Sequence, residues 1–231
     1  MNILCIIPAR GGSKGVYKKN IKLCNGKPLI AYTIEEAKKS KYIDRIIVST
    51  DDNDIASIGK KFGAEVPFLR PDEIAGDDTP GITPIIHAIN WLKDNEGYLP
   101  DYVMCLQCTS PLRKVEHIDE AIEKLINLEV DSLVSVCEVE HSPFWMKEIN
   151  NGKMKDFIQT DKNNLYRRQN LPTIYRLNGA IYIAKTQKLL QIKNWYTEDT
   201  IPYIMDKISS VDIDDEIDFK FGEFLLKDRG F

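Results

Sequence analysis

Short apolar runs alternate with amphipathic stretches along the first 140 residues of the chain. The stretch 27–40 is typical of a helix because Ile30, Ile34 and Ala37 recur three and four positions apart, whereas 2–9 is uniformly apolar, like a buried strand. Strands that alternate with helices predict βαβ units, a mostly parallel sheet and hence an α/β fold. Strands are predicted at 2–9, 45–50, 65–70, 101–108 and 131–140, and helices at 27–40, 51–63, 83–95 and 117–128.

The alternation stops near residue 141, where a different kind of segment begins. Asn151-Gly152, between two short strand-like runs, is a strong signal for a tight hairpin, and the polar, basic and aromatic residues after it show no period. We therefore divide the chain into an α/β domain, formed by 1–140 and 179–231, and an inserted subdomain at 141–178. After the insertion the pattern predicts a strand at 180–184, a helix at 185–194 and a strand leading into a helix at 211–230.

Composition narrows the classes of partner. The 231 residues carry a net charge of -4 and a pI near 5.5, which argues against a broad nucleic-acid surface. The longest apolar runs are far shorter than the roughly 20 residues of a membrane span, and the N-terminus lacks the pattern of a signal peptide. Five cysteines without a regular framework are typical of reduced thiols. We expect a cytoplasmic protein that binds neither nucleic acid nor membranes.

A cluster of positive charge follows the first predicted strand. The stretch "ARGGSKGVYKKNIKLCNGK" holds six cations and no carboxylate. Open α/β sheets bind ligands at the carboxyl ends of their strands, and glycines let backbone amides approach phosphate groups. The spacing matches neither a Walker A loop nor a dinucleotide fingerprint, so we favour a nucleotide phosphate loop of another type over a merely mobile basic loop. The cations are Arg10, Lys14, Lys18, Lys19, Lys22 and Lys27.

An acidic counterpart, "VDIDDEID", lies near the end of the chain. If this stretch is a strand, Asp212 and Asp214 are two positions apart and point to one face. Paired carboxylates suit Mg²⁺, which bridges phosphate oxygens and activates a coordinated hydroxyl. The alternative is that Asp214 or Asp215 caps the helix that follows, but a cap does not require Asp212.

Several blocks of sequence together resemble one enzyme family, the acylneuraminate cytidylyltransferases, which make CMP-sialic acid. The blocks occur in family order from one terminus to the other, and the ordered set is far more specific than any single block. The resemblance implies a Rossmann-like nucleotidyltransferase fold with an inserted dimerisation subdomain, and hence a homodimer. The blocks are "IIPARGGSKGVYKKNI", "GKPLIAYTIEEA", "VSTDDNDIA", "GAEVPFLRP", "LQCTSPLR", "RRQNLP", "RLNGAIYI" and "VDIDDEID".

The reaction that the resemblance implies joins CTP and a nonulosonic acid to give the CMP-sugar and pyrophosphate, with Mg²⁺ as cofactor. A cytidylyltransferase specific for legionaminate, or another sugar nucleotidyltransferase of similar fold, is the nearest alternative. A non-catalytic nucleotide-binding protein is a third, which is disfavoured because it would not need the paired aspartates. The sugar that such an enzyme accepts depends on the shape of its pocket, so the acid itself stays open.

Roles carried over from the family fall into four groups. The catalytic residues are Arg10, Lys19 and Asp214, and the metal ligands are Asp212 and Asp214. The residues assigned to the nucleotide are Arg10, Gly11, Gly12, Ser13, Lys19, Asn20 and Arg70. Those assigned to the sugar are Gln107, Ser110, Arg168, Gln169, Arg176 and Asn178.

Three further positions qualify this assignment. Asp51 and Asp52 follow a predicted strand and precede a predicted helix, so their expected role is to cap that helix. Cys108 stands where the family usually has proline, which leaves the geometry of the local turn open. We expect the polar side chains next to Cys108 to keep the roles that the resemblance implies for them.

Overall fold

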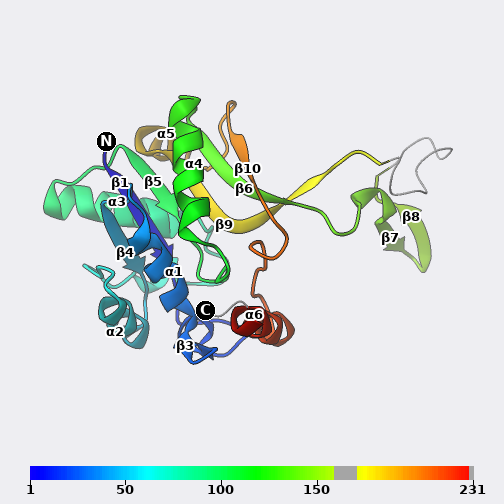
Figure 1. Cartoon of the computed structure of the whole chain (residues 1–231), viewed down its shortest axis with the longest axis horizontal. Helices are drawn as coiled ribbons and strands as arrows, with labels where there is room; N and C mark the ends of the chain where they lie inside the picture. The colour runs from blue at the N-terminus through cyan, green and yellow to red at the C-terminus, as the bar shows by residue number, and fades with distance from the viewer. Residues whose placement is uncertain (159–170, 229–231) are drawn as a thin grey trace.

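The computed structural model describes residues 1–158 and 171–228. Its central sheet consists of β1 (Ile3–Pro8), β4 (Arg45–Ser49), β5 (Tyr102–Cys105), β6 (Ser132–Glu138), β9 (Tyr175–Lys185) and β10 (Ile201–Met205). The strand order is β10-β6-β9-β5-β1-β4, with β9 antiparallel to both neighbours and every other pair parallel (Figure 1). The predicted α/β class with a mostly parallel sheet is confirmed.

Helices cover both faces of this sheet. They are α1 (Leu29–Lys39), α2 (Asn53–Phe62), α3 (Thr83–Glu96), α4 (Val115–Asn127), α5 (Thr186–Ile192) and α6 (Glu216–Asp228). Alternate residues of β1 pack against the helices on opposite faces of the sheet, because successive side chains of a strand point to opposite faces. Ile3, Cys5 and Ile7 pack with α1, α2 and α4, whereas Leu4 and Ile6 pack with α3 and α5. Within the described residues, no helix is both long and apolar enough to cross a membrane.

The start and end of α2 follow the local sequence as predicted. The carboxylate of Asp52 accepts hydrogen bonds from the backbone N–H groups of Asp54 and Ile55, as an N-cap does. Gly63 ends the helix with a φ of 96°, a left-handed conformation that favours glycine. The expected cap by Asp52 is confirmed, and the predicted end of the helix at residue 63 agrees with its last residue, Phe62.

Two strand predictions in the first half are wrong in extent. At 65–70 only Glu65 pairs, through an isolated bridge to Ile47, because Pro67 has no N–H to continue a ladder. The strand predicted at 101–108 ends at Cys105, and the chain beyond it turns along the edge of the sheet. Apolar character continues past the point where hydrogen-bonded pairing stops.

The acidic stretch near the C-terminus was predicted to be a strand, and this prediction is wrong. The edge position beside β6 is taken by β10, which the sequence analysis did not identify. β10 contains Pro202, which an edge strand tolerates because one side of it needs no donor. The segment before α6 is irregular instead, and Ile213 N–H donates to Thr109 O at 2.9 Å. Asp212 and Asp214 therefore do not share the face of a strand.

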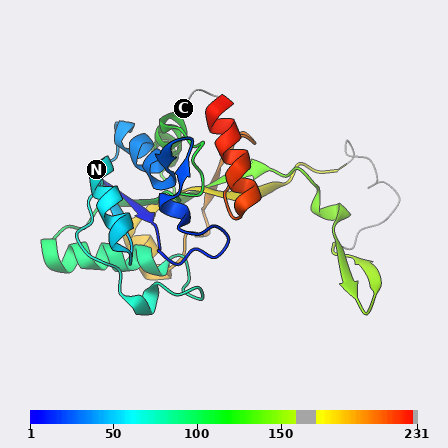
Figure 2. The same cartoon turned by 90° about the horizontal axis from the view of Figure 1, so that it is seen from below.

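The predicted hairpin is present as β7 (Lys147–Asn150) and β8 (Lys153–Asp156). Asn151 and Gly152 form its turn with positive φ values of 52° and 74°. The hairpin stands well away from the central sheet in both views (Figures 1 and 2). β9 begins at Tyr175 and pairs with β6 from there, so the strand includes the last residues of the segment assigned to the insertion. The division into two domains stays a prediction.

Candidate active site

The basic loop, residues 10–22, leaves the carboxyl end of β1 and lies over that edge of the sheet. Two hydrogen bonds fix its course. The backbone N–H of Gly11 donates to Asp51 Oδ1 at 3.0 Å, and the side-chain amide of Asn20 donates to Arg10 O at 3.0 Å. Asn20 is buried, so the loop is tied down from its inner side. Asp51, expected to cap α2 together with its neighbour, instead holds this loop.

The basic loop also packs against the acidic segment that precedes α6, which lies beside it in Figure 2. A Cβ at Gly15 would lie 2.1 Å from Asp214 O, so only glycine allows the two backbones to approach this closely. Lys19 Nζ donates to Ile213 O at 2.7 Å and lies 3.8 Å from Asp214 Oδ1. Cations near the start of the chain and carboxylates near its end therefore form one surface.

These contacts border a cavity of about 340 Å³, which we call the basic cavity. Its charged side chains are Arg10, Lys14, Lys19 and Asp214, and Gln107 adds an amide. The structure thus brings all three residues assigned to catalysis to one cavity. The complete lining is Pro8, Arg10, Ser13, Lys14, Gly15, Lys19, Asn20, Gln107, Cys108, Thr109 and Asp214.

Asp212 is more buried than Asp214. Its Oδ1 is buried and has no hydrogen-bond partner among the described residues. Burial raises the pKa of Asp212, a hydrogen bond from Thr109 opposes that effect, and the nearby charge of Asp214 adds to it. A Cβ on Gly179, whose φ is 71°, would lie 3.5 Å from Asp212 Oδ2, so this carboxylate sits close against β9. An unpartnered carboxylate oxygen beside a second carboxylate is a donor set that suits a divalent cation.

A second cavity of about 520 Å³ adjoins the first, because Arg10 and Gln107 line both. We call it the aromatic cavity, since Tyr182, Trp195 and Tyr196 contribute to its wall. Trp195 is buried against Tyr182, with ring centroids 5.6 Å apart. Together the two cavities form a bipartite site with a charged half and an aromatic half.

Arg70 lines the aromatic cavity near the end of β4. It is only 5% exposed, and its guanidinium donates to Ser49 O at 2.5 Å and to Ser49 Oγ at 3.2 Å. Burial lowers the pKa of Arg70, while the nearby charge of Asp51 opposes that effect. The two bonds to one residue fix the plane of the guanidinium at the cavity wall.

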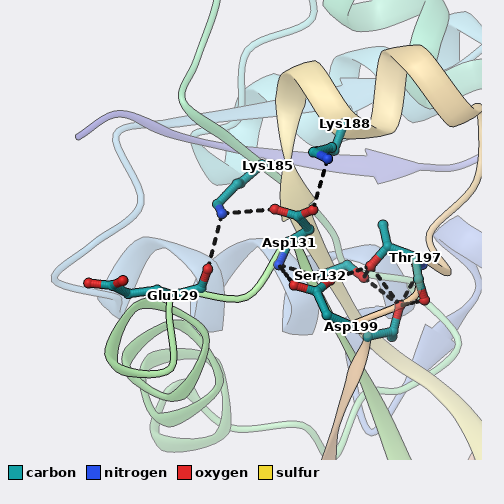
Figure 3. Close-up of polar contacts among 8 residues, drawn as sticks. Glu129, Asp131, Ser132, Lys185, Lys188, Thr197 and Asp199 are labelled. Carbon is teal, nitrogen blue, oxygen red and sulfur yellow. Dashed lines mark hydrogen bonds and ion pairs between the residues drawn. The ribbon is translucent and has the colours of Figure 1, made fainter.

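A polar network anchors the chain segment that carries Trp195 and Tyr196 into the aromatic cavity (Figure 3). The backbone N–H of Asp131 donates to the carboxylate of Asp199 at 3.1 Å. The hydroxyl oxygens of Ser132 and Thr200 lie 2.7 Å apart. The segment after the aromatic pair is thus tied to the start of β6. That start lies at the edge of the sheet opposite the carboxyl end of β1, from which the basic loop leaves.

Arg113 supports Gln107 from beneath the site. Its side chain is almost wholly buried and donates to Gln107 O at 3.1 Å, to Ala180 O at 2.8 Å and to Thr33 Oγ1 at 2.8 Å. Burial lowers the pKa of Arg113 to about 10, so it stays charged at neutral pH. Arg113 therefore joins the turn after β5 to β9 and to α1.

Two residues assigned to the sugar lie within the protein interior. Ser110 is completely buried and does not line either cavity. Asn178 is 1% exposed, where it accepts from Ser135 Oγ at 2.5 Å and donates to Ser210 Oγ at 2.9 Å. Asn178 thus joins β9 to β6 and to the segment after β10, whereas the buried Ser110 Oγ has no hydrogen-bond partner among the described residues.

The remaining assigned residues are placed as follows. Arg176 lies on β9 with its Nε 3.4 Å from a Glu140 carboxylate oxygen. Gly12 is exposed in the basic loop and does not line the basic cavity. Arg168 and Gln169 lie outside the described residues.

Sequence reasoning missed several residues of the site. Gly15 and Arg113 fall within the quoted blocks, but nothing in their spacing shows which backbone they approach. Asp77, Trp195 and Tyr196 lie in connections without a periodic pattern. The Gly-Asp-Asp run that contains Asp77 is the one local signal of a turn that could have drawn attention to it.

Comparison with known proteins agrees with this geometry. The family model described as cytidylyltransferase matches residues 4–227. A CMP-N,N'-diacetyllegionaminic acid synthase from Legionella pneumophila is 38% identical over 229 residues, which cover 98% of this chain and 97% of that protein. An N-acylneuraminate cytidylyltransferase from Escherichia coli is 37% identical over 219 residues, which cover 94% of this chain but 50% of that protein.

A solved structure supports the fold independently. The CMP:2-keto-3-deoxy-manno-octonic acid synthetase complexed with CTP has a TM-score of 0.73 at 14% identity, with 99% of this chain and 100% of that chain covered. At that identity the likeness concerns the fold alone. The family model and both relatives span nearly the whole of this chain, which confirms the resemblance carried by the ordered motifs. The chain therefore belongs to the cytidylyltransferase family.

Proposed function

We propose that this protein transfers a cytidylyl group from CTP to the anomeric oxygen of a sialic-type nonulosonic acid and releases pyrophosphate. Relatives named for the CMP-activation of neuraminate and legionaminate match nearly the entire chain. The division of the site into a basic cavity and an adjoining aromatic cavity suits two substrates, one polyanionic and one bulky and polar.

The observation that carries this proposal is the convergence of Arg10, Lys19 and Asp214 on one cavity. A triphosphate needs several cations close together, and this cavity offers three on one rigidly tied loop. Arg10 binds phosphate oxygens through its planar fork of donors, and Lys19 acts as a point charge held at the cavity wall.

The reaction forms one bond as another breaks. The anomeric oxygen of the sugar attacks the α-phosphorus and gives up its hydroxyl proton to water. The bond from that phosphorus to the oxygen bridging to the β-phosphate breaks, with the electron pair leaving on pyrophosphate. Positioning and charge neutralisation dominate such a transfer. Arg10 and Lys19 stabilise the negative charge that grows on the leaving group.

We further propose that Asp212 and Asp214 hold Mg²⁺ when CTP is bound. The buried, unpartnered Oδ1 of Asp212 and the repulsion between the two carboxylates both favour a bound cation. The described residues contain no group of three or more His, Cys, Asp or Glu side chains around a metal position. This suits Mg²⁺, which commonly takes one or two carboxylates and completes its shell with phosphate oxygens and water. When bound, Mg²⁺ supplies charge neutralisation and lowers the pKa of a coordinated hydroxyl.

The sugar would occupy the aromatic cavity, where Gln107 is shared with the basic cavity. Arg176, Arg168 and Gln169 remain our candidates for its carboxylate and polar substituents, since a guanidinium binds a carboxylate through two parallel hydrogen bonds. We propose a cytoplasmic location, which the five free cysteines of the chain suit.

We propose that the protein is a homodimer held through the hairpin β7–β8. Ile149 and Met154 lie directly opposite each other on this hairpin and are 74% and 69% exposed. Burial of these side chains against a second copy would remove apolar surface from water. Trp145 and Met146, which precede β7, and Phe157, which follows β8, are exposed as well.

Release of pyrophosphate tests the proposal directly. The purified protein is incubated with CTP and Mg²⁺ plus N-acetylneuraminic acid or N,N'-diacetyllegionaminic acid, and pyrophosphate is measured. We expect release that depends on the sugar, on CTP rather than ATP, GTP or UTP, and on Mg²⁺. If no nonulosonic acid supports release with any nucleotide, the protein is a nucleotide-binding protein without this activity.

A further inference from the structure

The cations of the basic cavity already hold an anion supplied by the chain itself. Arg10 Nη1 lies 2.7 Å from Asp77 Oδ1, and Lys14 Nζ lies 2.5 Å from Asp77 Oδ2. The hydrogen bonds from Lys14 and Arg10 lower the pKa of Asp77, so the carboxylate is ionised at neutral pH. Both of its oxygens are used, one by each cation.

Asp77 belongs to the connection between Arg70 and α3. Arg70 anchors one end of this connection through its bonds to Ser49, and α3 begins the other end at Thr83. Several residues of this connection form one wall of the aromatic cavity. They are Ile74, Gly76, Asp77, Thr79, Pro80, Gly81 and Ile82.

We propose that Asp77 is an intramolecular competitor for the triphosphate: it occupies Arg10 and Lys14 in the nucleotide-free protein and is displaced when phosphate binds. The inference rests on the proposed function, which places the triphosphate in the basic cavity. A carboxylate and a phosphate group seek the same donors, and their like charges repel at close range. The two anions therefore alternate at this pair of cations.

Displacement of Asp77 has a consequence for the second cavity. The pairs with Arg10 and Lys14 join the connection 71–82 to the basic loop across the site. Once phosphate replaces Asp77, that tie is lost and one wall of the aromatic cavity is released. Binding of the nucleotide is thereby coupled to the shape of the cavity proposed for the sugar.

The neighbouring residue supplies a matched control. Asp78 is exposed in the same connection and has no ion pair within the described residues. Asp77→Asn and Asp78→Asn remove the same charge from nearly the same place, but only Asp77→Asn removes the competitor. Asp77 is itself 39% exposed, so neither change creates a buried defect, and thermal melting of both variants verifies the fold.

The experiment measures the dissociation constants of pyrophosphate and of CTP by calorimetry, without sugar and with EDTA present. Because solvent-exposed ion pairs are individually weak, we expect Asp77→Asn to bind pyrophosphate about threefold to tenfold more tightly than the wild type. For Asp78→Asn we expect the dissociation constant of pyrophosphate to stay within about twofold of the wild-type value, since the charge of Asp78 is screened by solvent. The difference in pyrophosphate affinity between Asp77→Asn and the wild type should shrink as the salt concentration rises.

Two results would overturn the inference. Equal affinities of Asp77→Asn and Asp78→Asn would mean that Asp77 does not compete, and weaker binding by Asp77→Asn would mean that it holds the cations in their binding geometry. In both cases normal CTP binding by the wild type leaves the proposed function intact. Failure of the wild type and both variants to bind CTP even when Mg²⁺ replaces EDTA would instead contradict the proposed function.

Discussion

The site depends at the residue scale on a few close approaches that permit little substitution. Gly15 is the clearest example, because its Cα faces a backbone carbonyl rather than a flexible side chain. Gly12, three residues earlier in the same loop, has nothing within 4 Å of the position of a Cβ. The two glycines therefore carry different constraints, although the sequence presents them as equivalent.

Alanine substitution separates these two glycines. In Gly15→Ala the new methyl group would overlap Asp214 O, so the loop and the acidic segment must move apart. We expect a loss of about 1–3 kcal/mol in the free energy of unfolding, the usual cost of overpacking. In Gly12→Ala the change should stay within about 0.5 kcal/mol. Chemical denaturation of both variants measures the difference, and equal values would refute the close approach.

Adjacent lysines provide a second test, this time of activity. Lys19 lies in the basic cavity, whereas Lys18 pairs with Asp54 at 2.9 Å outside it. We expect Lys19→Met to lower kcat by about 100-fold because it removes a cation that we propose stabilises the leaving group. Lys18→Met should change kcat by no more than about twofold, since its pair is solvent-exposed. Similar kinetics of the two variants would remove Lys19 from the catalytic machinery.

Assignments made by residue identity alone place a side chain near the site without showing which way it faces. Gln107 and Ser110 come from one block of sequence, yet Gln107 lines both cavities while Ser110 is completely buried. The reason is that β5 ends at Cys105, so the strand period no longer orients the residues beyond it. Asn178, on β9, instead lies in a buried hydrogen-bond network.

At the scale of elements, helix ends follow local chemistry. Like α2, the helix α4 has a side chain bonded at its start, because His117 Nδ1 accepts from the backbone N–H of Lys114 at 3.1 Å. This bond requires the unprotonated form of Nδ1. Burial lowers the pKa of His117 below its ordinary value of 6.5, which also favours the neutral ring.

The start of α4 should therefore make stability depend on pH. Because the folded pKa of His117 is lower than the unfolded one, the unfolded chain binds the proton more readily. Its contribution is fully present above the unfolded pKa and is lost as the pH falls through the folded pKa. We expect the free energy of unfolding to drop between pH 7.5 and 5.5, and to drop less in His117→Gln, which keeps an acceptor that does not titrate. Urea denaturation at both pH values measures this.

The comparison of the variant with the wild type is the informative quantity, because burial lowers the pKa of His87 too. His87 contributes the same sign of pH dependence to both proteins and cancels in the difference. An identical loss of stability in wild type and His117→Gln would show that the bond to Lys114 does not matter.

Strand prediction failed where pairing depends on distant parts of the chain. β10 contains Pro202 and alternates weakly, so nothing local identified it, yet β6 accepts it as a parallel edge strand. The acidic segment before α6 looked more strand-like and pairs with no strand among the described residues. Whether a segment joins a sheet is decided by the partner available at that edge.

The whole molecule combines a packed α/β body with a hairpin that stands apart from it (Figure 1). The body buries apolar side chains against both faces of its sheet. The hairpin exposes apolar side chains instead, which the proposed homodimer would cover. We attribute that cover to a second copy of the chain.

Mutation of the hairpin tests this assembly. Ile149→Glu and Met154→Glu together place two charges on the exposed apolar face, where burial against a partner would cost several kcal/mol. We expect the double variant to be a monomer by light scattering at concentrations where the wild type is a dimer. Lys153→Glu alters charge on the opposite face of the same hairpin and should leave the dimer intact. A wild type that is itself monomeric would end the proposal.

The α/β alternation of the first 140 residues apart from the segment 65–70, the N-cap of α2 and the hairpin turn at Asn151-Gly152 were determined by the sequence alone. Each rests on a period or a local backbone preference that needs no knowledge of distant residues. The ordered motifs likewise identified the family. The tertiary structure alone decided that Gly15 meets Asp214 and that Asp77 holds Arg10, because residues far apart in the chain meet only through the way that the sheet and its helices pack.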